Sequence, residues 1–241
     1  MAQRIETYAR FLDRYQQLAG IETMSAGQIA TAQQFFNRNM RKAWESYEWP
    51  FSVVMESRTP SSDKVIWEES GQTPISEVFG VYSDNPYTAS SWRAVSYTLT
   101  VDGIQLLGPD APSPVYVHYR SRVPLYTGAA YDNATAYAVG DQVYYATTGD
   151  FYICIATTTG NVPTTTAKWT RLTVPYDLFE YASAASAGDL LLANGQNDRG
   201  FALRNDAKEW LYDAIEKYSR QQNQTLPRNV FRTHGSQSLS N

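Results

Sequence analysis

The apolar residues of this chain follow a helical period at both ends and a strand period between them. A helix with one apolar stripe must bury that stripe, so the two helical ends are expected to pack on each other in space. This predicts an α+β fold. Terminal helices form a helical bundle, an antiparallel β-sheet region lies between them, and a small three-stranded β insert is added.

Two helices are expected within residues 1–50. Phe11 and Tyr15 belong to an apolar stripe of helical period that Gly20 ends. Ser25 stands three residues before Gln28, which predicts a capping box at the start of a second helix. Pro50 is the latest point at which this second helix can end.

Residues 51–127 have the pattern of a β-sheet domain. Asp102-Gly103 predicts a tight hairpin turn between two β-prone runs. Farther along, Val115, Val117 and Tyr119 alternate with polar or half-polar neighbours. This period of two predicts a strand that is buried on one face.

Residues 128–172 form a segment with little charge and many Thr, Ala and aromatic residues. Two short strands are expected, over residues 143–145 and 151–155, joined by a turn at Gly149-Asp150. We expect Val143, Phe151, Ile153 and Ile155 to build its minimal core. The change in composition indicates a small inserted unit.

Helical patterns return in residues 173–222. One helix is expected after Pro175, with Asn194-Gly195 at its end, and another from about Gly200 to Gln221. Residues 1–50 and 173–222 would then form one discontinuous helical domain. Residues 223–241 are polar and unpatterned, which predicts a flexible C-terminal arm.

The composition favours a globular chain with extensive interfaces. Hydrophobic residues make up 43% of the 241 residues and aromatic residues 14%, while the net charge of −4 gives no overall basic footprint for nucleic acid. The single cysteine, Cys154, cannot form an internal disulfide. No apolar run is long enough for a bilayer and the N-terminus lacks a signal-peptide pattern, so we expect a soluble chain made in the cytoplasm.

Catalytic motifs are missing from the sequence. It has no nucleophile elbow, zinc-protease motif, phosphate-binding glycine loop or dinucleotide fingerprint. Its two histidines, His118 and His234, lie far apart in the sequence, and the adjacent Glu68 and Glu69 would point to opposite faces of a strand. The sequence therefore predicts a protein that is not an enzyme and has no catalytic residues, no metal site and no cofactor.

The insert resembles small carbohydrate-binding modules of the chitin-binding type. The resemblance covers residues 128–172 and rests on Ala136 to Val143 with its Gly140-Asp141 turn, on Phe151 to Cys154, and on Pro163 and Trp169. It implies that the rings of Tyr144, Tyr152 and Trp169 stack on sugar faces. The alternative is that these rings form the small core or pack on a neighbouring subunit.

The remaining segments resemble bacteriophage head-to-tail connector proteins, the adaptor or tubular type of short-tailed phages. The pattern comprises N-terminal helices, a β-region ending in Val115 to Tyr119 and Val123-Pro124, and helices that begin after Pro175. An Ala-rich helix, a Gly195-Gln196 break and a long final helix complete it. The insert is a departure from the simplest members.

The second resemblance implies a structural virion protein of the neck, assembled in the host cytoplasm. Its partners would be the portal protein, a tail or nozzle protein and further copies in a homo-oligomeric ring, a dodecamer in that family. DNA would pass through without sequence-specific binding, and no membrane is involved. An acidic lumen would repel phosphate and let the genome slide.

A portal-docking arm is implied by the same resemblance. The residues assigned to this arm are Gln224, Leu226, Arg228, Phe231 and Arg232. The alternative function is a carbohydrate-binding virion or surface protein that uses the insert for host attachment. An enzyme with an unfamiliar motif is a third hypothesis.

Overall fold

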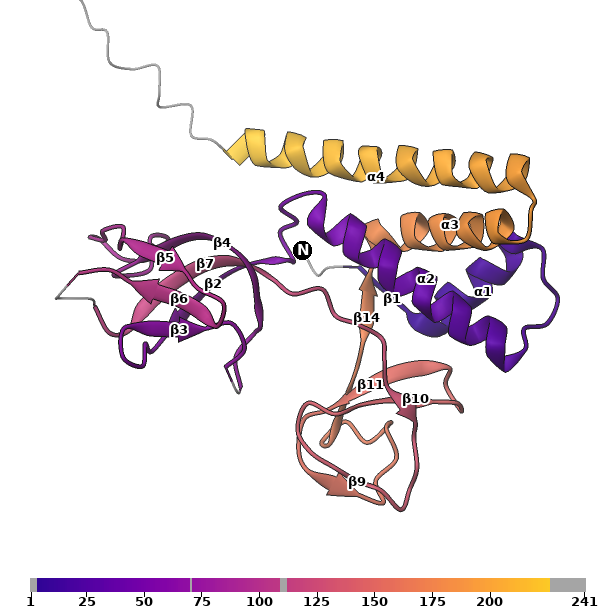
Figure 1. Ribbon diagram of the computed structural model, residues 1–241, viewed down its shortest axis with the longest axis horizontal. Helices are drawn as coiled ribbons and strands as arrows, with labels where there is room; N and C mark the ends of the chain where they lie inside the picture. The colour runs from indigo at the N-terminus through magenta and orange to yellow at the C-terminus, as the bar shows by residue number, and fades with distance from the viewer. Residues whose placement is uncertain (1–3, 70, 109–111, 226–241) are drawn as a thin grey trace, which may run out of the picture.

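The computed structural model describes residues 4–69, 71–108 and 112–225, and it has three lobes (Figure 1). A helical lobe contains both ends of the described chain, a sheet lobe follows the second helix, and the insert projects from a separate place on the helical lobe. The predicted α+β class is confirmed, with four helices and several antiparallel sheets among the described residues.

The helical lobe is organised around one central helix. Its helices are α1 (Tyr8–Ala19), α2 (Ala26–Glu45), α3 (Tyr176–Ala193) and α4 (Asn197–Thr225). Figure 1 shows α3 between α4 on one side and α1 with α2 on the other. Thus the two ends of the chain enclose the same helix.

The central position of α3 follows from its composition. Every residue from Tyr181 to Leu191 is buried, so this helix has no solvent face along three turns. Small residues allow close neighbours: a Cβ atom added to Gly188 would lie 2.9 Å from the carbonyl oxygen of Gly200 in α4. The two helices therefore pack at very short range.

The expected bundle of terminal helices is wrong. A strand, β1 (Ile5–Thr7), precedes α1 and pairs antiparallel with β14 (Thr173–Pro175), which leads directly into α3. In addition, α1 and α2 both pack on α3 and meet each other mainly through Phe11 and Phe36, whose ring centroids lie 4.2 Å apart. The apolar stripes indicated that each helix buries one face, but they did not reveal that α3 buries every face.

The predicted helix ends are confirmed at several positions. Gly20 ends α1 in the left-handed conformation, with φ of 71°. Ser25 and Gln28 form both hydrogen bonds of a capping box, so α2 begins where the sequence indicated. Asn194 caps α3, and Gly195 follows with φ of 75°.

A buried carboxylate links three of the helices. The side chain of Asp189 in α3 is only 7% exposed. It accepts hydrogen bonds from Arg38 and, at 2.8 Å, from Asn39 Nδ2, both in α2. The Nε of Arg204 in α4 lies 3.7 Å from its other oxygen. This one side chain therefore fixes α2 and α4 against α3.

The sheet lobe consists of two three-stranded antiparallel sheets with a core between them. Their orders are β2-β7-β4 and β3-β6-β5. The alternation predicted for residues 115–120 is confirmed as far as Tyr119, because Val115, Val117 and Tyr119 are fully buried and the residues between them are half-buried, whereas Arg120 is buried as well. The strands are β2 (Val53–Arg58), β3 (Lys64–Ile66), β4 (Ile75–Tyr82), β5 (Tyr97–Leu99), β6 (Gly103–Leu106) and β7 (Val115–Ser121).

The insert has more strands than the three that were expected. It contains a four-stranded sheet of order β13-β11-β10-β8 and a two-stranded pair, β12-β9. The additional sheet strand, β8, runs parallel to β10, where Gly128 allows the two backbones to approach closely. The strands are β8 (Ala129–Ala130), β9 (Ala136–Tyr137), β10 (Gln142–Tyr145), β11 (Asp150–Cys154), β12 (Thr158–Thr159) and β13 (Trp169–Arg171).

Substitution of Asp189 tests the link between the helices. We expect Asp189→Ala to lower the free energy of unfolding by about 2–3 kcal/mol, because Asn39 and two arginines lose a shared buried partner. Urea denaturation measures the change. Glu216→Ala is the control, since its ion pair with Arg220 is exposed and contributes less than about 0.5 kcal/mol. Equal effects of the two substitutions would contradict the linking role.

Candidate functional site

The described residues offer little that is typical of a catalytic centre. They contain no group of three or more His, Cys, Asp or Glu side chains placed to hold a metal ion. Burial lowers the pKa of His118, with a smaller opposing effect from Glu48, so this imidazole is uncharged near neutral pH. Its ring packs edge-on against Phe79 and Tyr87. None of the helices described combines the length and apolar composition needed to cross a bilayer.

Two of the three rings expected to contact carbohydrate are buried inside the insert. Trp169 is 2% exposed and Tyr152 is 6% exposed, and both belong to the core of the insert. Trp169 donates a hydrogen bond from Nε1 to the carbonyl oxygen of Asn161, and its ring lies 5.2 Å from that of Tyr137. Neither ring presents a flat face to solvent, and their burial favours the alternative in which they form the core.

The third ring, Tyr144, faces the helical lobe. It packs against Phe151 with ring centroids 5.2 Å apart, and both rings line a cavity of about 110 Å³ at the boundary with the helices. Tyr8 lines the same cavity, and its hydroxyl has no hydrogen-bond partner among the described residues. Burial raises the pKa of Tyr8, so this hydroxyl stays protonated. Tyr144 thus belongs to a lobe boundary.

Two further rings of the insert, Tyr131 and Tyr145, are half-buried and pack edge-on against each other. The large apolar side chains that residues 128–172 expose are Val139, Ile155 and Val162, all of them aliphatic. Sugar recognition by stacking requires the face of an aromatic ring. The three rings predicted to stack on sugar therefore do not form an exposed platform.

The core expected for the insert is partly wrong. Val143 is buried there as predicted, but Ile155 is 46% exposed and Phe151 packs into the core of the helical lobe. Tyr152 and Cys154, on the opposite face of β11, fill the insert instead. Alternate residues of a strand point to opposite faces. The prediction assigned the wrong face of β11 to the core of the insert, and that face packs against the helical lobe instead.

Adjacent residues of β11 attach the insert to the helical lobe. Phe151 meets the ring of Tyr8 edge-on at 4.9 Å and that of Tyr126 at 5.7 Å. The buried carboxylate of Asp150 accepts a hydrogen bond of 2.9 Å from the backbone N–H of Ala9, in the first turn of α1. A carboxylate is favourable at a helix N-terminus, so this contact both caps α1 and holds the insert.

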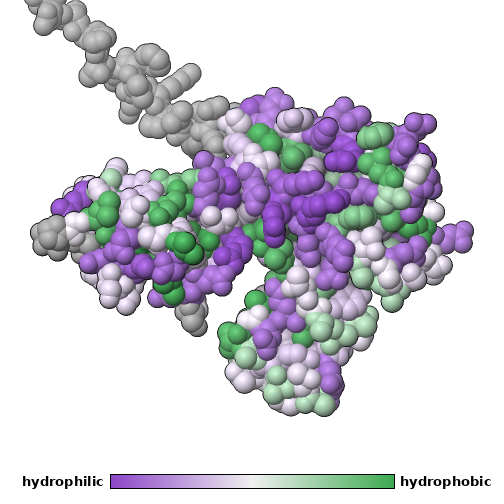
Figure 2. All heavy atoms as spheres, viewed as in Figure 1, coloured by the Kyte–Doolittle hydropathy of each residue, from purple (hydrophilic) through white to green (hydrophobic). Residues whose placement is uncertain are grey.

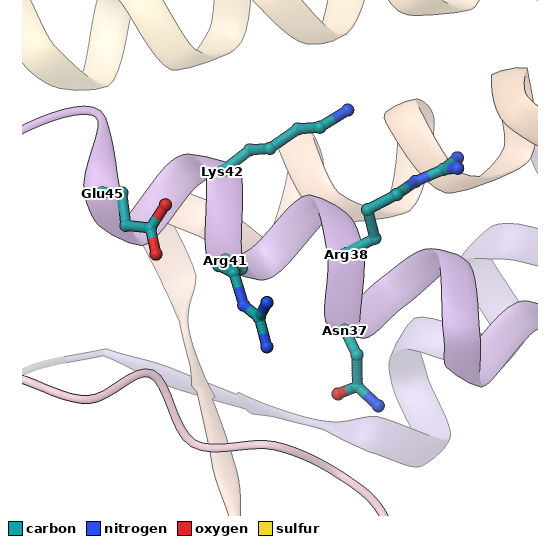
Figure 3. A pocket seen from close by; sticks show the side chains of 5 residues that line it. All are labelled: Asn37, Arg38, Arg41, Lys42 and Glu45. Atoms are coloured by element: carbon teal, nitrogen blue, oxygen red, sulfur yellow. The ribbon is translucent and has the colours of Figure 1, made fainter. Parts of the chain in front are cut away.

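A basic face lies on the outer side of α2. We define it as Arg38, Arg41 and Lys42, which with Asn37 and Glu45 line a hollow of about 340 Å³ (Figure 3). Arg38 is held by Asp189, whereas Arg41 and Lys42 are exposed and form no ion pair within the described residues. Figure 3 shows Arg38 and Lys42 extending from one side of α2 and Arg41 from the other.

An acidic stripe lies on the outer side of α4. All five of its carboxylates are exposed, and only Glu216 has an ion-pair partner within the part of the chain that is described. Their spacings place them on one face of a helix with 3.6 residues per turn. We define the stripe as Asp198, Asp206, Glu209, Asp213 and Glu216.

The residues assigned to a portal-docking arm fall largely outside the described part of the chain. Leu226, Arg228, Phe231 and Arg232 lie beyond it. Gln224 lies in the last turn of α4, which ends at Thr225, and its side chain is not among those described. Helix α4 therefore continues past residue 223, where the sequence predicted the arm to begin.

No family model matches this chain, and neither a curated protein nor a solved structure does. Candidate function therefore rests on the geometry of the lobes and on the resemblances drawn from the sequence. Reasoning from the sequence missed the acidic stripe, although the spacing of its carboxylates was a readable signal. It also missed Asp150, whose partner is a backbone N–H more than a hundred residues away and leaves no trace in the sequence.

Substitution of Asp150 tests the attachment of the insert. We expect Asp150→Ala to cost about 1–2 kcal/mol, since the first turn of α1 loses a capping carboxylate. Hydrogen exchange should then become faster both in α1 and in β11. Asp132→Ala is the control, because that carboxylate bonds only within the insert. Unchanged exchange in α1 after Asp150→Ala would contradict the attachment.

Substitution of Trp169 distinguishes a core ring from a sugar platform. We expect Trp169→Ala to cost the insert about 3–5 kcal/mol of packing and to unfold it locally. Amides of β10 and β11 should lose their protection from exchange, while Val162→Ala, an exposed site in the insert, should leave them protected. A Trp169→Ala chain with an intact insert and lost binding to chitin would instead indicate a sugar site.

Proposed function

We propose that the protein is a non-enzymatic structural subunit of a virus particle, a head-to-tail adaptor of the bacteriophage neck. Copies would form a ring, a dodecamer as in the family that the sequence resembles, beneath the portal and around the DNA channel. The ring would link the capsid to a tail or nozzle protein. The proposal starts from the sequence resemblance and is supported by the surface of the isolated chain.

The observation that carries the proposal is the exposure of large apolar side chains on all three lobes. On α4, Phe201 is 57% and Tyr212 is 68% exposed, and in the sheet lobe Tyr87 is 71% and Trp92 is 51% exposed. In the insert, Val139 is 65% exposed. Aromatic residues are enriched where proteins meet partners, so this distribution suits a subunit with neighbours on several sides.

The lobes suit different parts of such an assembly. The helical lobe, in which α3 is enclosed by segments from both chain ends, is a closely packed body that would suit a ring wall. The sheet lobe and the insert project from it and would face outward or toward the tail (Figure 1). A net charge of −4 suits DNA that slides through without being bound in a sequence-specific way.

The alternative function, attachment to a host surface through carbohydrate, has less support. It depended on exposed rings in the insert, and two of these rings are buried in its core. The third lines the boundary with the helical lobe. We therefore favour a role for the insert as a rigid spacer or decoration of the particle.

Attachment to the portal tests the proposed function. We expect the full chain to co-sediment with the portal protein of the same virus in a sucrose gradient. A chain that ends at Thr225 should lose this attachment and keep its helical circular dichroism, because α4 remains complete. The control is Asp132→Ala, which should co-sediment like the unaltered chain. Failure of the full chain to co-sediment would contradict the adaptor role, and attachment of the shortened chain would contradict the docking arm.

A further inference from the structure

The outer surfaces of α2 and α4 carry opposite charges that the chain itself does not neutralise. The basic face of α2 has Arg41 and Lys42 without an ion-pair partner among the described residues. The acidic stripe of α4 has four carboxylates in the same condition, and only Glu216 is paired. Figure 2 shows hydrophilic residues gathered at the centre of the molecule, over α2.

Within the described part of one subunit, no ion pair joins the two surfaces. They lie on separate helices, and α3 stands between these helices (Figure 1). Each surface is therefore available to a second molecule, and one subunit can use both at once. Opposite charges on different surfaces favour contacts of the head-to-tail kind, which generate rings when the rotation closes.

The spacings of the charges on the two surfaces also match. The stripe extends over about 27 Å of α4, from Asp198 to Glu216, at 1.5 Å per residue. The basic face lines a hollow of about 340 Å³. Glu209 and Asp213 are four residues apart, as are Arg38 and Lys42, so one turn of each helix presents two charges at the same separation.

An exposed ring accompanies the carboxylates. Tyr212 lies directly before Asp213 in α4 and is 68% exposed. An aromatic ring that enters a hollow lined by guanidinium groups gains both buried apolar area and attraction to the cations. The ring would thus add an apolar anchor to a contact that charge pairs alone would leave weak in salt.

We propose that the acidic stripe of α4 docks on the basic face of α2 of a second copy of this chain. This inference rests on the proposed function, since it assigns the contact between neighbouring subunits of the ring. Glu209 and Asp213 pair with Arg38, Arg41 and Lys42 of the neighbour, and Tyr212 occupies the hollow. Asp189 holds Arg38 in position, so it orients one side of the contact from beneath.

Charge reversal on each surface tests the contact. Sedimentation velocity of the full chain at about 0.1 mM protein and low salt should show self-association that weakens as salt rises. We expect Glu209→Lys with Asp213→Lys, or Arg41→Glu with Lys42→Glu, to weaken it about tenfold. The chain that carries all four reversals should regain most of the association. Tyr212→Ala, at an exposed site, should weaken association without loss of fold.

A matched control has the same change of charge elsewhere. Asp13→Lys with Glu22→Lys replaces one Asp and one Glu at exposed sites away from both surfaces, and its association should equal that of the unaltered chain. If the charge reversals left self-association unchanged, the proposed contact between α4 and α2 would be overturned. That result would not exclude a ring built through other surfaces. A chain that stays monomeric under these conditions would also overturn the proposed contact. Co-sedimentation with the portal tests the adaptor role independently of this contact.

Duplex DNA provides a second arm of the test. If Arg41→Glu with Lys42→Glu abolished binding to DNA and left self-association unchanged, the basic face would be a phosphate-binding surface. That result would overturn the proposed contact. We expect the unaltered chain to bind DNA weakly or not at all, because the acidic stripe and the net charge of −4 repel phosphate.

Discussion

The helical lobe depends on the enclosure of α3. A helix that is buried on every side for three turns cannot be stable alone and needs partners around its whole circumference. These partners come from both ends of the chain: α1 and α2 from the beginning, and α4 from the end. Asp189 adds specificity, because its buried carboxylate is satisfied only when α2 and α4 bring their polar groups to it. The sheet lobe and the insert are thus formed by the chain between the two sequence segments that build the helical lobe.

The insert is fastened to this body through adjacent residues of one strand. Phe151 enters the helical core while Asp150 caps α1, and the next residue, Tyr152, turns back into the core of the insert. A strand buried on both faces in this way leaves no row of rings free for a ligand. The contacts that attach the insert to the helical lobe therefore weaken its case as a carbohydrate-binding module.

Local signals in the sequence were reliable, whereas relations between distant segments were not. The capping box at Ser25 and the alternation of Val115 and Val117 depend on neighbouring residues alone, and both are confirmed. The helical bundle was wrong because the all-round burial of α3 and the β1–β14 ladder depend on tertiary pairing. The prediction of which face of β11 lies in the core of the insert was wrong. Apolar residues lie on both faces of this strand, so the sequence pattern alone could not identify the core face. For the candidate surfaces, charge spacing along α4 was predictable, but the proposed pairing with α2 required the positions of both helices in the structure.

Apolar side chains exposed on every lobe and opposite charges on α2 and α4 are the features that support the proposed ring. Electron cryomicroscopy of the protein mixed with the portal of the same virus tests this most directly. We expect a collar of repeated subunits beneath the portal, in which the helical lobes form the wall and α4 of each copy lies on α2 of the next. Portal particles without a collar, beside free monomers, would contradict the adaptor role.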